Sequence, residues 1–483
     1  MLSDFIVRIT CMIPQLFFQI SLFWRESYSC YLDLIQVRST QTDFKSVRFL
    51  LILLFLRCTV SCYSEMEKSL TSRKWGTIKP ADIKTLRTER HWLENVLPTV
   101  KPNASKTPLT LTIGNPVIYS AFEPENTALE ILSDSIGEAT GYTSPGGDIE
   151  CRKYLAQAYS TETWKLTEDD IFLGAGCNGV LNQIHHVLAD PGDTVLLPKV
   201  LFPLMKAISI NREVNVDEYE FLPEKNWEVN LKDLEERLAK KPKFVYFLNP
   251  SNPLGSVWSA DHVSEILSLA NKYKVPVVTD EIYEGLIFSN SSFNSFGKLS
   301  KGQPVFVCSG YSKMGLAPGW RLGWAVCYGK PEIIAPIKKA LAKTSLYSLK
   351  CNSAVQVELP KLVEASFSYI KAKSVEAEKR AKVFEEALEG CPGISVFKPS
   401  GTMFAIIRIR YDEFVDIKSS RDFAIKLLEE ENINILPGHL FGDDDFIRVV
   451  ILDDEEVLRE FGTRTREFVM RHIVRGEQKN EAK

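Results

Sequence analysis

The feature that most restricts the fold is a regular alternation, through the middle of the chain, of short apolar runs and longer stretches with helical periodicity. This alternation is typical of an α/β fold in which helices cover a mostly parallel sheet. Ligands bind such sheets at the carboxyl ends of the strands. The residues directly after each apolar run are therefore the candidates for a binding site. The runs expected to form strands are Asp170–Gly174, Asp193–Leu197, Lys243–Leu248, Val275–Thr279 and Val305–Cys308.

A glycine-rich turn ends the first of these runs. Residues 174–179 read GAGCNG, and helical spacing continues from Val180. A glycine-rich turn that opens a helix presents backbone N–H groups at the positive end of the helix dipole, which suits a phosphate group. The turn matches neither the dinucleotide fingerprint nor the Walker pattern, so those nucleotide cofactors are not expected. A simple tight turn is the alternative interpretation.

The next three strand ends carry an aromatic residue, an asparagine and an acid. Phe202 follows the second run, where core packing is the alternative role. The third run ends in NPSNPLG (249–255), whose two Asn-Pro steps restrict the backbone and direct an asparagine side chain out of the strand end. The fourth ends in Asp280-Glu-Ile-Tyr283. A buried carboxylate there is costly unless a cation pairs with it, although Asp280 could instead cap a helix.

The fifth run leads into SGYSKMGLAPGWRLGW (309–324), which places Lys313 and Arg321 on either side of a Gly/Pro turn. A single lysine in such a place is usually just exposed. Together, however, the strand ends collect a phosphate-type turn, an aromatic ring, an asparagine, an acid, a tyrosine, a lysine and an arginine at one sheet edge. Pyridoxal 5′-phosphate (PLP) needs a lysine for its aldehyde, an acid at its ring nitrogen, an aromatic face and a phosphate site.

These motifs resemble those of class I aminotransferases, and most of all those of the tyrosine aminotransferase subgroup. The likeness is carried by NPSNPLGSVWS (249–259), DEIY (280–283) and SK…PGWRLGW (312–324), and it runs from about Trp75 to about Ile473. It implies the α/β fold of fold type I PLP-dependent transferases, with a mostly parallel seven-stranded sheet in a large domain and a smaller α+β domain. The implied divisions are an extension over residues 1–65, an N-terminal segment over 66–115, the large domain over 116–345 and the small domain over 346–483.

The resemblance also implies a role for each matching residue. Lys313 would bond to the cofactor and then move the proton at the substrate α-carbon. Arg448, which could otherwise be a surface arginine on a strand, would hold the substrate α-carboxylate with help from Gly114 and Asn252. The other cofactor-binding residues would be Asp280 at the ring nitrogen, Tyr283 and Asn252 at the ring hydroxyl, Phe202 against the ring, Arg321, Ser312 and the backbone of Gly176, Cys177 and Asn178 at the phosphate, and Tyr142 at the phosphate of a second subunit in a homodimer. No metal site is predicted.

The expected reaction is transfer of the amino group of an aromatic L-amino acid, tyrosine, to a 2-oxo acid such as 2-oxoglutarate, giving 4-hydroxyphenylpyruvate and glutamate. Burial and the nearby Arg321 should lower the pKa of Lys313, so that its free amine serves as a base. Three departures from the family pattern concern the pocket: Gly310 replaces a common serine, Leu254 replaces a small residue, and the loop 200–204 lacks a glycine. Because of the first departure, the sequence leaves open whether Ser309 or Ser312 supplies the hydroxyl at the phosphate. The alternatives are an aminotransferase for alanine or kynurenine, a cysteine-S-conjugate β-lyase, and a non-catalytic PLP-fold regulator.

Net charge and cysteine content bear on the binding partners and the cellular compartment of the protein. The formal net charge of −4 gives no indication of nucleic-acid binding. The ten cysteines include no CxxC pair, which indicates reduced core residues and therefore the cytoplasm. Two apolar patches, 13–24 and 49–56, lie in the first 65 residues. Each is shorter than the roughly 18 apolar residues that span a bilayer, so membrane insertion is not expected. The extension is a weak targeting segment, a non-functional stretch, or sequence upstream of a true start at Met66.

Overall fold

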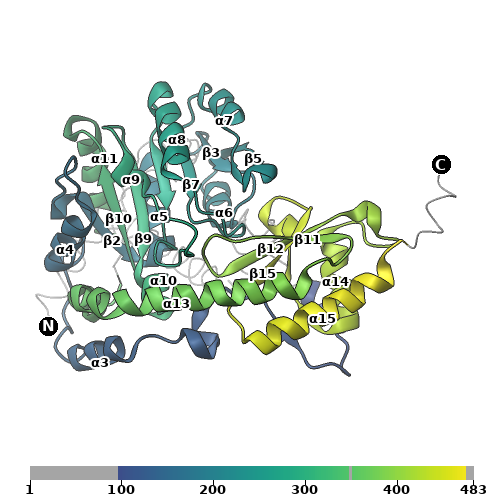
Figure 1. Cartoon of the computed structure of the whole chain (residues 1–483). Coiled ribbons are helices and arrows are strands. Elements are labelled where there is room, and N and C mark those ends of the chain that lie inside the picture. Colours follow the sequence, from purple (N-terminus) through teal and green to yellow (C-terminus); the bar gives the residue numbers. More distant parts are fainter. Residues whose placement is uncertain (1–95, 348–350, 475–483) are drawn as a thin grey trace, which may run out of the picture. The chain divides into compact units, whose positions relative to one another are not determined.

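A seven-stranded sheet forms the largest layer of the structure (Figure 1). The computed structural model describes residues 96–347 and 351–474, all within the unit Asp82–Lys483. The strand order is β2–β10–β9–β8–β7–β3–β4, and every strand except β10 runs in the same direction. The strands are β2 (Ile171–Ala175), β3 (Thr194–Pro198), β4 (Asn215–Tyr219), β7 (Val245–Leu248), β8 (Val277–Asp280), β9 (Val305–Gly310) and β10 (Leu322–Tyr328).

The predicted mostly parallel α/β sheet is confirmed, and each predicted strand lies within two residues of an observed one. Strands β7, β8, β9 and β10 are buried along their whole length. Such continuous burial explains the unbroken apolar runs in the sequence, because helices cover both faces of a parallel sheet. The helices of this part are α3 (Asn126–Ser135), α4 (Ile149–Tyr159), α5 (Gly176–Leu188), α6 (Leu204–Asn211), α7 (Leu231–Leu238), α8 (Ala260–Tyr273), α9 (Phe296–Leu299), α10 (Tyr311–Met314), α11 (Pro331–Thr344) and α12 (Ser353–Val357).

A second, antiparallel sheet lies in the C-terminal part of the chain. Its four strands have the order β11–β12–β15–β14. The long helix α13 (Leu359–Leu388) contacts α3 and α4 beside the first sheet and α15 beside the second, as Figure 1 shows. The predicted domain boundaries remain predictions. The elements are β11 (Ile394–Phe397), β12 (Phe404–Ile409), β14 (Leu436–Pro437), β15 (Phe446–Val450), α14 (Ser420–Glu431) and α15 (Glu455–His472), with a short pair β5 (Phe221–Leu222) and β6 (Glu228–Val229) elsewhere.

Residues 103–114, which we call the strap, run along the C-terminal part and then reach Lys313, which follows β9 of the first sheet. In the strap, β1 (Leu109–Thr110) pairs in parallel with β13 (Ile433–Asn434). The carbonyl of Leu111 then accepts a hydrogen bond from the amide of Val450 on β15, with an N–O distance of 2.9 Å. The strap is therefore held by main-chain bonds to the C-terminal elements just before it enters the site described below.

One edge of the seven-stranded sheet collects the carboxyl ends of all strands except β10. Because β10 is antiparallel, its first residues lie at this same edge, where Gly323 pairs with Gly310 of β9. The β9–β10 hairpin therefore brings Lys313, just after β9, and Arg321, just before β10, to one place. Both residues therefore lie at the edge where the sequence predicted a ligand, and they do so because β10 runs in the opposite direction to the other strands.

Two expectations from composition can be compared with the described residues. The cysteines there, six in number, are all buried, as predicted for core residues. Within the described ranges, no helix has the length and apolar character needed to cross a membrane. The predicted N-terminal extension lies outside the described residues.

Candidate active site

Helix α5 begins at the sheet edge without a capping side chain. Its N-cap residue, Ala175, offers no side-chain acceptor, whereas Asp148 and Ser259 cap α4 and α8 with theirs. The Gly176 amide donates to the carbonyl of Arg321 at 2.9 Å. The amides of the next two residues, the predicted phosphate-binding pair Cys177 and Asn178, stand in the first helical turn, where amides have no intrahelical partner. The positive end of the helix dipole adds to their attraction for an anion.

The guanidinium of Arg321 lies directly against this helix start. Arg321 has the left-handed backbone conformation (φ 55°), and its side chain donates to the carbonyls of Pro318 at 2.9 Å and Ala175 at 3.0 Å. A Cβ atom at Gly176 would lie only 2.5 Å from Arg321 Nη2, so the guanidinium occupies the space of the missing side chain. The predicted phosphate-binding residues Gly176 and Arg321 are therefore in contact.

Three glycines in register let α5 approach the sheet. Gly310 of β9, Gly323 of β10 and Gly174 of β2 are neighbours across the three strands. A Cβ at Gly323 would lie 2.2 Å from the carbonyl carbon of Gly176, and one at Gly310 would lie 2.7 Å from the carbonyl oxygen of Leu322. The serine that we expected at position 310 is thus excluded by the backbone of the neighbouring strand.

Replacing Gly323 with alanine should therefore destabilise the protein. The added Cβ would push the first turn of α5 away from the sheet, and overpacking of this kind costs about 1–3 kcal/mol of unfolding free energy. Thermal unfolding of the variant measures the effect. Gly319→Ala is the matched control, because a Cβ there meets nothing within 4 Å. Equal midpoints for the two variants would contradict the proposed close packing.

Lys313 lies half-buried in α10, with its amine in contact with the strap. Lys313 Nζ donates a hydrogen bond to the Gly114 carbonyl at 2.7 Å. Burial, and in second place the positive charge of Arg448, lower the pKa of Lys313 to about 8. The prediction of a lowered pKa is confirmed, but its assignment to Arg321 was wrong. The Arg321 guanidinium faces carbonyls at the start of α5, whereas Arg448 is the cation that acts on the amine.

The lowered pKa should be visible as a pH dependence. Only the neutral amine reacts with an acylating reagent, so acetylation of Lys313 in the cofactor-free protein should rise through pH 8 and level off above it. An ordinary lysine would show a midpoint near about 10.4. Mass spectrometry of Lys313 peptides after brief acetic anhydride treatment measures the midpoint. Arg448→Leu should raise it, since one source of repulsion is removed. A wild-type midpoint near that of exposed lysines would contradict the assignment.

Asp280, the last residue of β8, is a buried acid. Burial raises the pKa of Asp280 to about 6, although hydrogen bonding from the Ile282 amide, the Cys177 thiol and Tyr246 acts in the opposite direction. The Ile282 amide lies 3.0 Å and the Cys177 sulfur 3.4 Å from Oδ1. These neighbours are neutral, so none of them supplies the cation that the sequence analysis expected beside a buried carboxylate. The side chain of Cys177, predicted only for its backbone, is thus an additional contact of this acid.

Asn252, Tyr283 and Phe202 stand beside one another at the same edge. The Phe202 amide donates to the Asn252 carbonyl at 3.1 Å. Burial raises the pKa of Tyr283 above its ordinary range, while a hydrogen bond with Asn252 acts in the opposite direction. The Tyr283 ring packs edge-on against Phe404 of β12, with ring centroids 5.9 Å apart. The predicted ring-binding residues therefore form one cluster, which touches the second sheet through Phe404.

Arg448 of β15 is a buried cation whose hydrogen bonds within the described chain go to neutral oxygens. Nη1 donates to Asn252 Oδ1 at 3.1 Å, and Nη2 donates to the carbonyl of Thr112 in the strap. The guanidinium also lies over the rings of Phe404 and Phe441, 4.4 Å and 4.9 Å from their centroids. Its Nε is buried without a hydrogen-bond partner among the described residues. Burial lowers the pKa of Arg448 to about 10, so the group remains a cation at neutral pH.

Two predicted residues remain to be placed, Tyr142 and Ser312. Tyr142 lies in the loop before α4 and is 92% exposed, so it is not one of the buried residues of the cluster. Of the two serines beside Gly310, Ser309 donates to Glu284 Oε1 at 3.0 Å and is engaged there. Ser312 is buried and lies next to Lys313 in α10. The phosphate hydroxyl that the sequence left open is therefore best sought at Ser312.

The contacts of the Arg448 guanidinium were not predicted from the sequence. Phe404 and Phe441 flank its guanidinium, and the Thr112 carbonyl accepts from it. Phe404 belongs to an apolar strand, where its local pattern indicates only core packing. A cation that lies over two aromatic rings leaves no short sequence signal here, because the three residues come from separate segments of the chain.

Known proteins resemble this chain over most of its length. A family model described as aminotransferase class I and II matches residues 107–461. Tyrosine aminotransferase of Mus musculus is 30% identical over 432 residues, covering 86% of this chain and 93% of that protein. S-alkyl-thiohydroximate lyase of Arabidopsis thaliana is 29% identical over 395 residues, covering 79% and 84%. A crystal structure of tyrosine aminotransferase from Leishmania infantum matches with a TM-score of 0.77 and 26% identity, covering 83% of this chain and all of that one.

Proposed function

The chain belongs to the class I and II aminotransferase family, and from this premise we propose that it moves the amino group of an aromatic L-amino acid to a 2-oxo acid. Tyrosine and 2-oxoglutarate are the proposed pair, giving 4-hydroxyphenylpyruvate and glutamate. The observation that carries the proposal is the buried guanidinium of Arg448 beside the half-buried amine of Lys313. A carboxylate-binding cation and a base next to one another suit chemistry at the α-carbon of an amino acid.

The sheet edge fits PLP, the cofactor on which this family depends. The uncapped start of α5, with glycine instead of side chains beneath Arg321, suits a phosphate group. We assign the phosphate to Arg321, Ser312 and the first-turn backbone of α5, namely Gly176, Cys177 and Asn178. The ring is assigned to Phe202 on its face, Asp280 at its nitrogen, and Asn252 and Tyr283 at its hydroxyl. When bound, PLP supplies an electron sink for the charge that develops at the α-carbon.

The protein's own groups would carry the proton and orient the substrate. Lys313 has a pKa of about 8, so a substantial fraction of its amine is neutral near pH 7.5 and can accept the α-proton. Arg448 would bind the α-carboxylate with its planar guanidinium, including Nε, which has no partner among the residues that the structure describes. The stacking rings of Phe404 and Phe441 exclude water from one side of that cation and strengthen its attraction for an anion.

Exposed apolar side chains support the proposed homodimer. Tyr142 is 92% and Phe367 71% exposed, and Leu129 and Ile136 in or next to α3 are 44% and 59% exposed. Helices α3 and α13 contact each other, so Leu129 and Phe367 belong to neighbouring elements. Tyr142 would then reach the phosphate of the second subunit. A mass of one chain in light scattering would contradict the dimer. A cytoplasmic location remains a prediction from the sequence.

The second candidate function is β-elimination from a sulfur-containing amino acid. It is favoured by one observation, the 29% identity to a protein named as a lyase of S-alkyl-thiohydroximates. Abstraction of the α-proton by Lys313 would serve both reactions. Aminotransfer with alanine or kynurenine as donor uses the same site and differs only in the side-chain pocket, where Leu254 is buried.

An amino-donor panel tests these proposals on the purified chain supplied with PLP. L-Tyrosine with 2-oxoglutarate should yield glutamate at a higher rate than L-alanine or L-kynurenine. A cysteine S-conjugate should yield little pyruvate, and pyruvate as the main product would favour the lyase instead. The protein should also acquire visible absorbance that remains after gel filtration, which reports cofactor binding separately from turnover. Absence of that absorbance would count against PLP binding and, with it, the whole assignment.

A further inference from the structure

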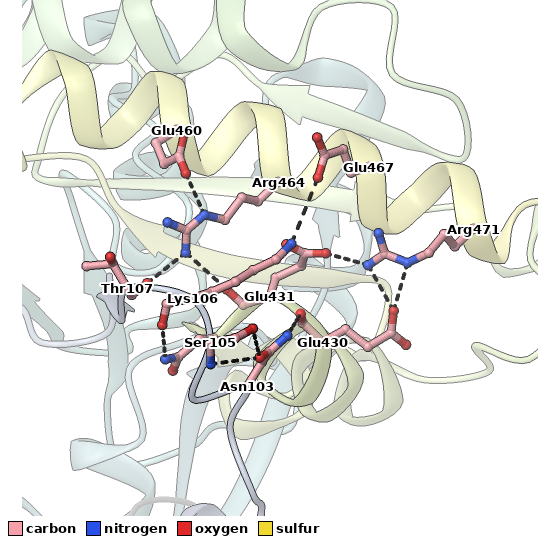
Figure 2. A network of polar contacts seen from close by, with 11 residues as sticks. Asn103, Ser105, Lys106, Thr107, Glu430, Glu431, Glu460, Arg464, Glu467 and Arg471 are labelled. Carbon is pink, nitrogen blue, oxygen red and sulfur yellow. Dashed lines mark hydrogen bonds and ion pairs between the residues drawn. The ribbon is translucent and has the colours of Figure 1, made fainter.

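The strap is fixed at its beginning by a buried acid. The side chain of Glu431, the last residue of α14, is fully buried, with 0% exposure. One of its carboxylate oxygens pairs with Lys106 of the strap and the other with Arg471 of α15, as Figure 2 shows. A carboxylate buried in this way is stable only while its cations remain in place. Lys106 is therefore held at a defined position on α14 and α15.

Further hydrogen bonds join the strap to the end of α14 and to α15 next to this pair (Figure 2). Two of them are donated to strap carbonyls, by Asn432 directly after α14 and by Arg464 of α15, and the third is donated by Asn103 of the strap to a carbonyl of α14. Such bonds to carbonyl groups fix the path of the backbone as well as the position of one side chain. The strap start is thus bound at three points close together in the chain. The bonds are Asn103 Nδ2 to the Glu430 carbonyl at 2.8 Å, Asn432 Nδ2 to the Lys106 carbonyl at 2.7 Å, and Arg464 Nη1 to the Thr107 carbonyl at 2.7 Å.

The other end of the strap supplies carbonyl groups to the active site. The amides of Leu109 and Leu111 donate to the carbonyls of Asn432 and Asn434, at 3.0 Å and 2.9 Å. Just beyond, the strap accepts two bonds from the site cations. The Thr112 carbonyl accepts from Arg448, and the Gly114 carbonyl accepts from Lys313 at 2.7 Å. A continuous path of bonded backbone therefore joins Lys106 to both cations.

We propose that Lys106 and Glu431 are positioning residues for the substrate carboxylate: their buried ion pair fixes the strap, and the strap orients Arg448. This deepens the proposed function and depends on it for the identity of the substrate. Neither residue is placed in contact with the reacting atoms. They act through the Thr112 and Gly114 carbonyls, so their loss should change how tightly substrate binds.

Substrate affinity should be affected more than the rate of the bound complex. Without the ion pair, the strap would be detached for part of the time, and a ligand binds only the competent fraction. Binding would then include the free-energy cost of ordering several backbone residues. Once substrate is bound, the strap is in the same place as in the wild-type protein. The turnover step should therefore proceed at nearly the wild-type rate.

Lys106→Met tests the inference, with hydrogen–deuterium exchange and steady-state kinetics as readouts. In the holoenzyme, exchange of the Leu109 and Leu111 amides should become several-fold faster than in wild type. The KM for L-tyrosine should rise by about tenfold, the equivalent of about 1.4 kcal/mol, with kcat changed less than about twofold. Lys106→Arg keeps a cation at the site and should restore both values.

Lys426→Met is the matched control. Lys426 lies on α14, pairs with Asp416 at 2.8 Å and is 32% exposed, close to the 31% of Lys106. It should leave the strap amides and KM unchanged. A lower unfolding midpoint for Lys106→Met with unchanged KM would assign the pair a structural role alone and overturn the inference, as would unchanged exchange. If the wild-type chain transaminates nothing, the proposed function fails. The exchange comparison would then still decide whether Lys106 holds the strap.

Discussion

Replacing Lys313 with alanine should reduce transamination by about 10⁴-fold, because the variant loses the proposed base for the α-proton and the proposed covalent anchor of the cofactor. Within residues 96–347 and 351–474, the amine makes one hydrogen bond, to the Gly114 carbonyl, so the fold should tolerate its removal. Burial penalises the charged form of this lysine, which also argues against a large loss of stability. Initial rates of glutamate formation from L-tyrosine and 2-oxoglutarate give the measurement.

The control for this variant is Lys343→Ala, which removes an exposed lysine from α11. Circular dichroism should show wild-type helix content for both proteins, and only the Lys313 variant should lose activity. The Lys313 variant should also lose the visible absorbance that depends on covalent attachment. Retained turnover in Lys313→Ala at more than a few per cent of wild type would exclude the assigned role.

Replacing Arg448 with leucine should lower kcat/KM for the amino acid by about 10³-fold, since truncating one member of a buried charged pair costs about 2–5 kcal/mol. The effect should be large because Arg448 is 3% exposed and its Nε, which has no hydrogen-bond partner in the part of the chain that the structure describes, can bind an anion. Arg448→Lys should recover only part of the loss, because an ammonium group cannot form the two-pronged bond to a carboxylate. Kinetics with both substrates varied give these ratios.

Arg408→Leu provides the comparison for Arg448. Arg408 lies on the neighbouring strand β12 but is exposed, so it shares the sheet and the residue type without the burial. Its loss should leave kcat/KM within about twofold of wild type, as for most surface substitutions. Equal losses in the two variants would mean that general charge on this sheet, and not the buried fork, attracts the substrate.

The sequence was informative about the first sheet because buried parallel strands have a local signature. The run Val305–Cys308 has no polar residue, and such a run is recognisable without any tertiary information. Strand β10 was not predicted, although it is buried throughout. Its beginning comes after a Gly/Pro-rich turn that reads as loop, and its antiparallel direction depends on pairing with β2 and β9.

For the site, residues at strand ends were predictable and their mutual effects were not. Asp280 and Lys313 could be found because each closely follows an apolar run. The charge that lowers the pKa of Lys313 comes from Arg448, which is far away in sequence and was assigned to the substrate alone. The hydrogen bond of Ser309 to Glu284 could not be predicted either, because strand β9 and the turn after β8 must both be folded before these side chains can meet.

The pairing of β9 with β10 restricts how many residues can lie between Lys313 and Arg321. Gly310 and Gly323 are paired across the ladder, so the loop that joins them begins and ends at fixed points. Inside this loop, the rings of Tyr311 and Trp320 stack with centroids 5.6 Å apart, which brings its two halves together. Inserting or deleting one residue between Lys313 and Arg321 would displace one of these two cations from the sheet edge while leaving the other in place. Loop length in related chains should therefore vary far less here than in the connections at the opposite edge of the sheet.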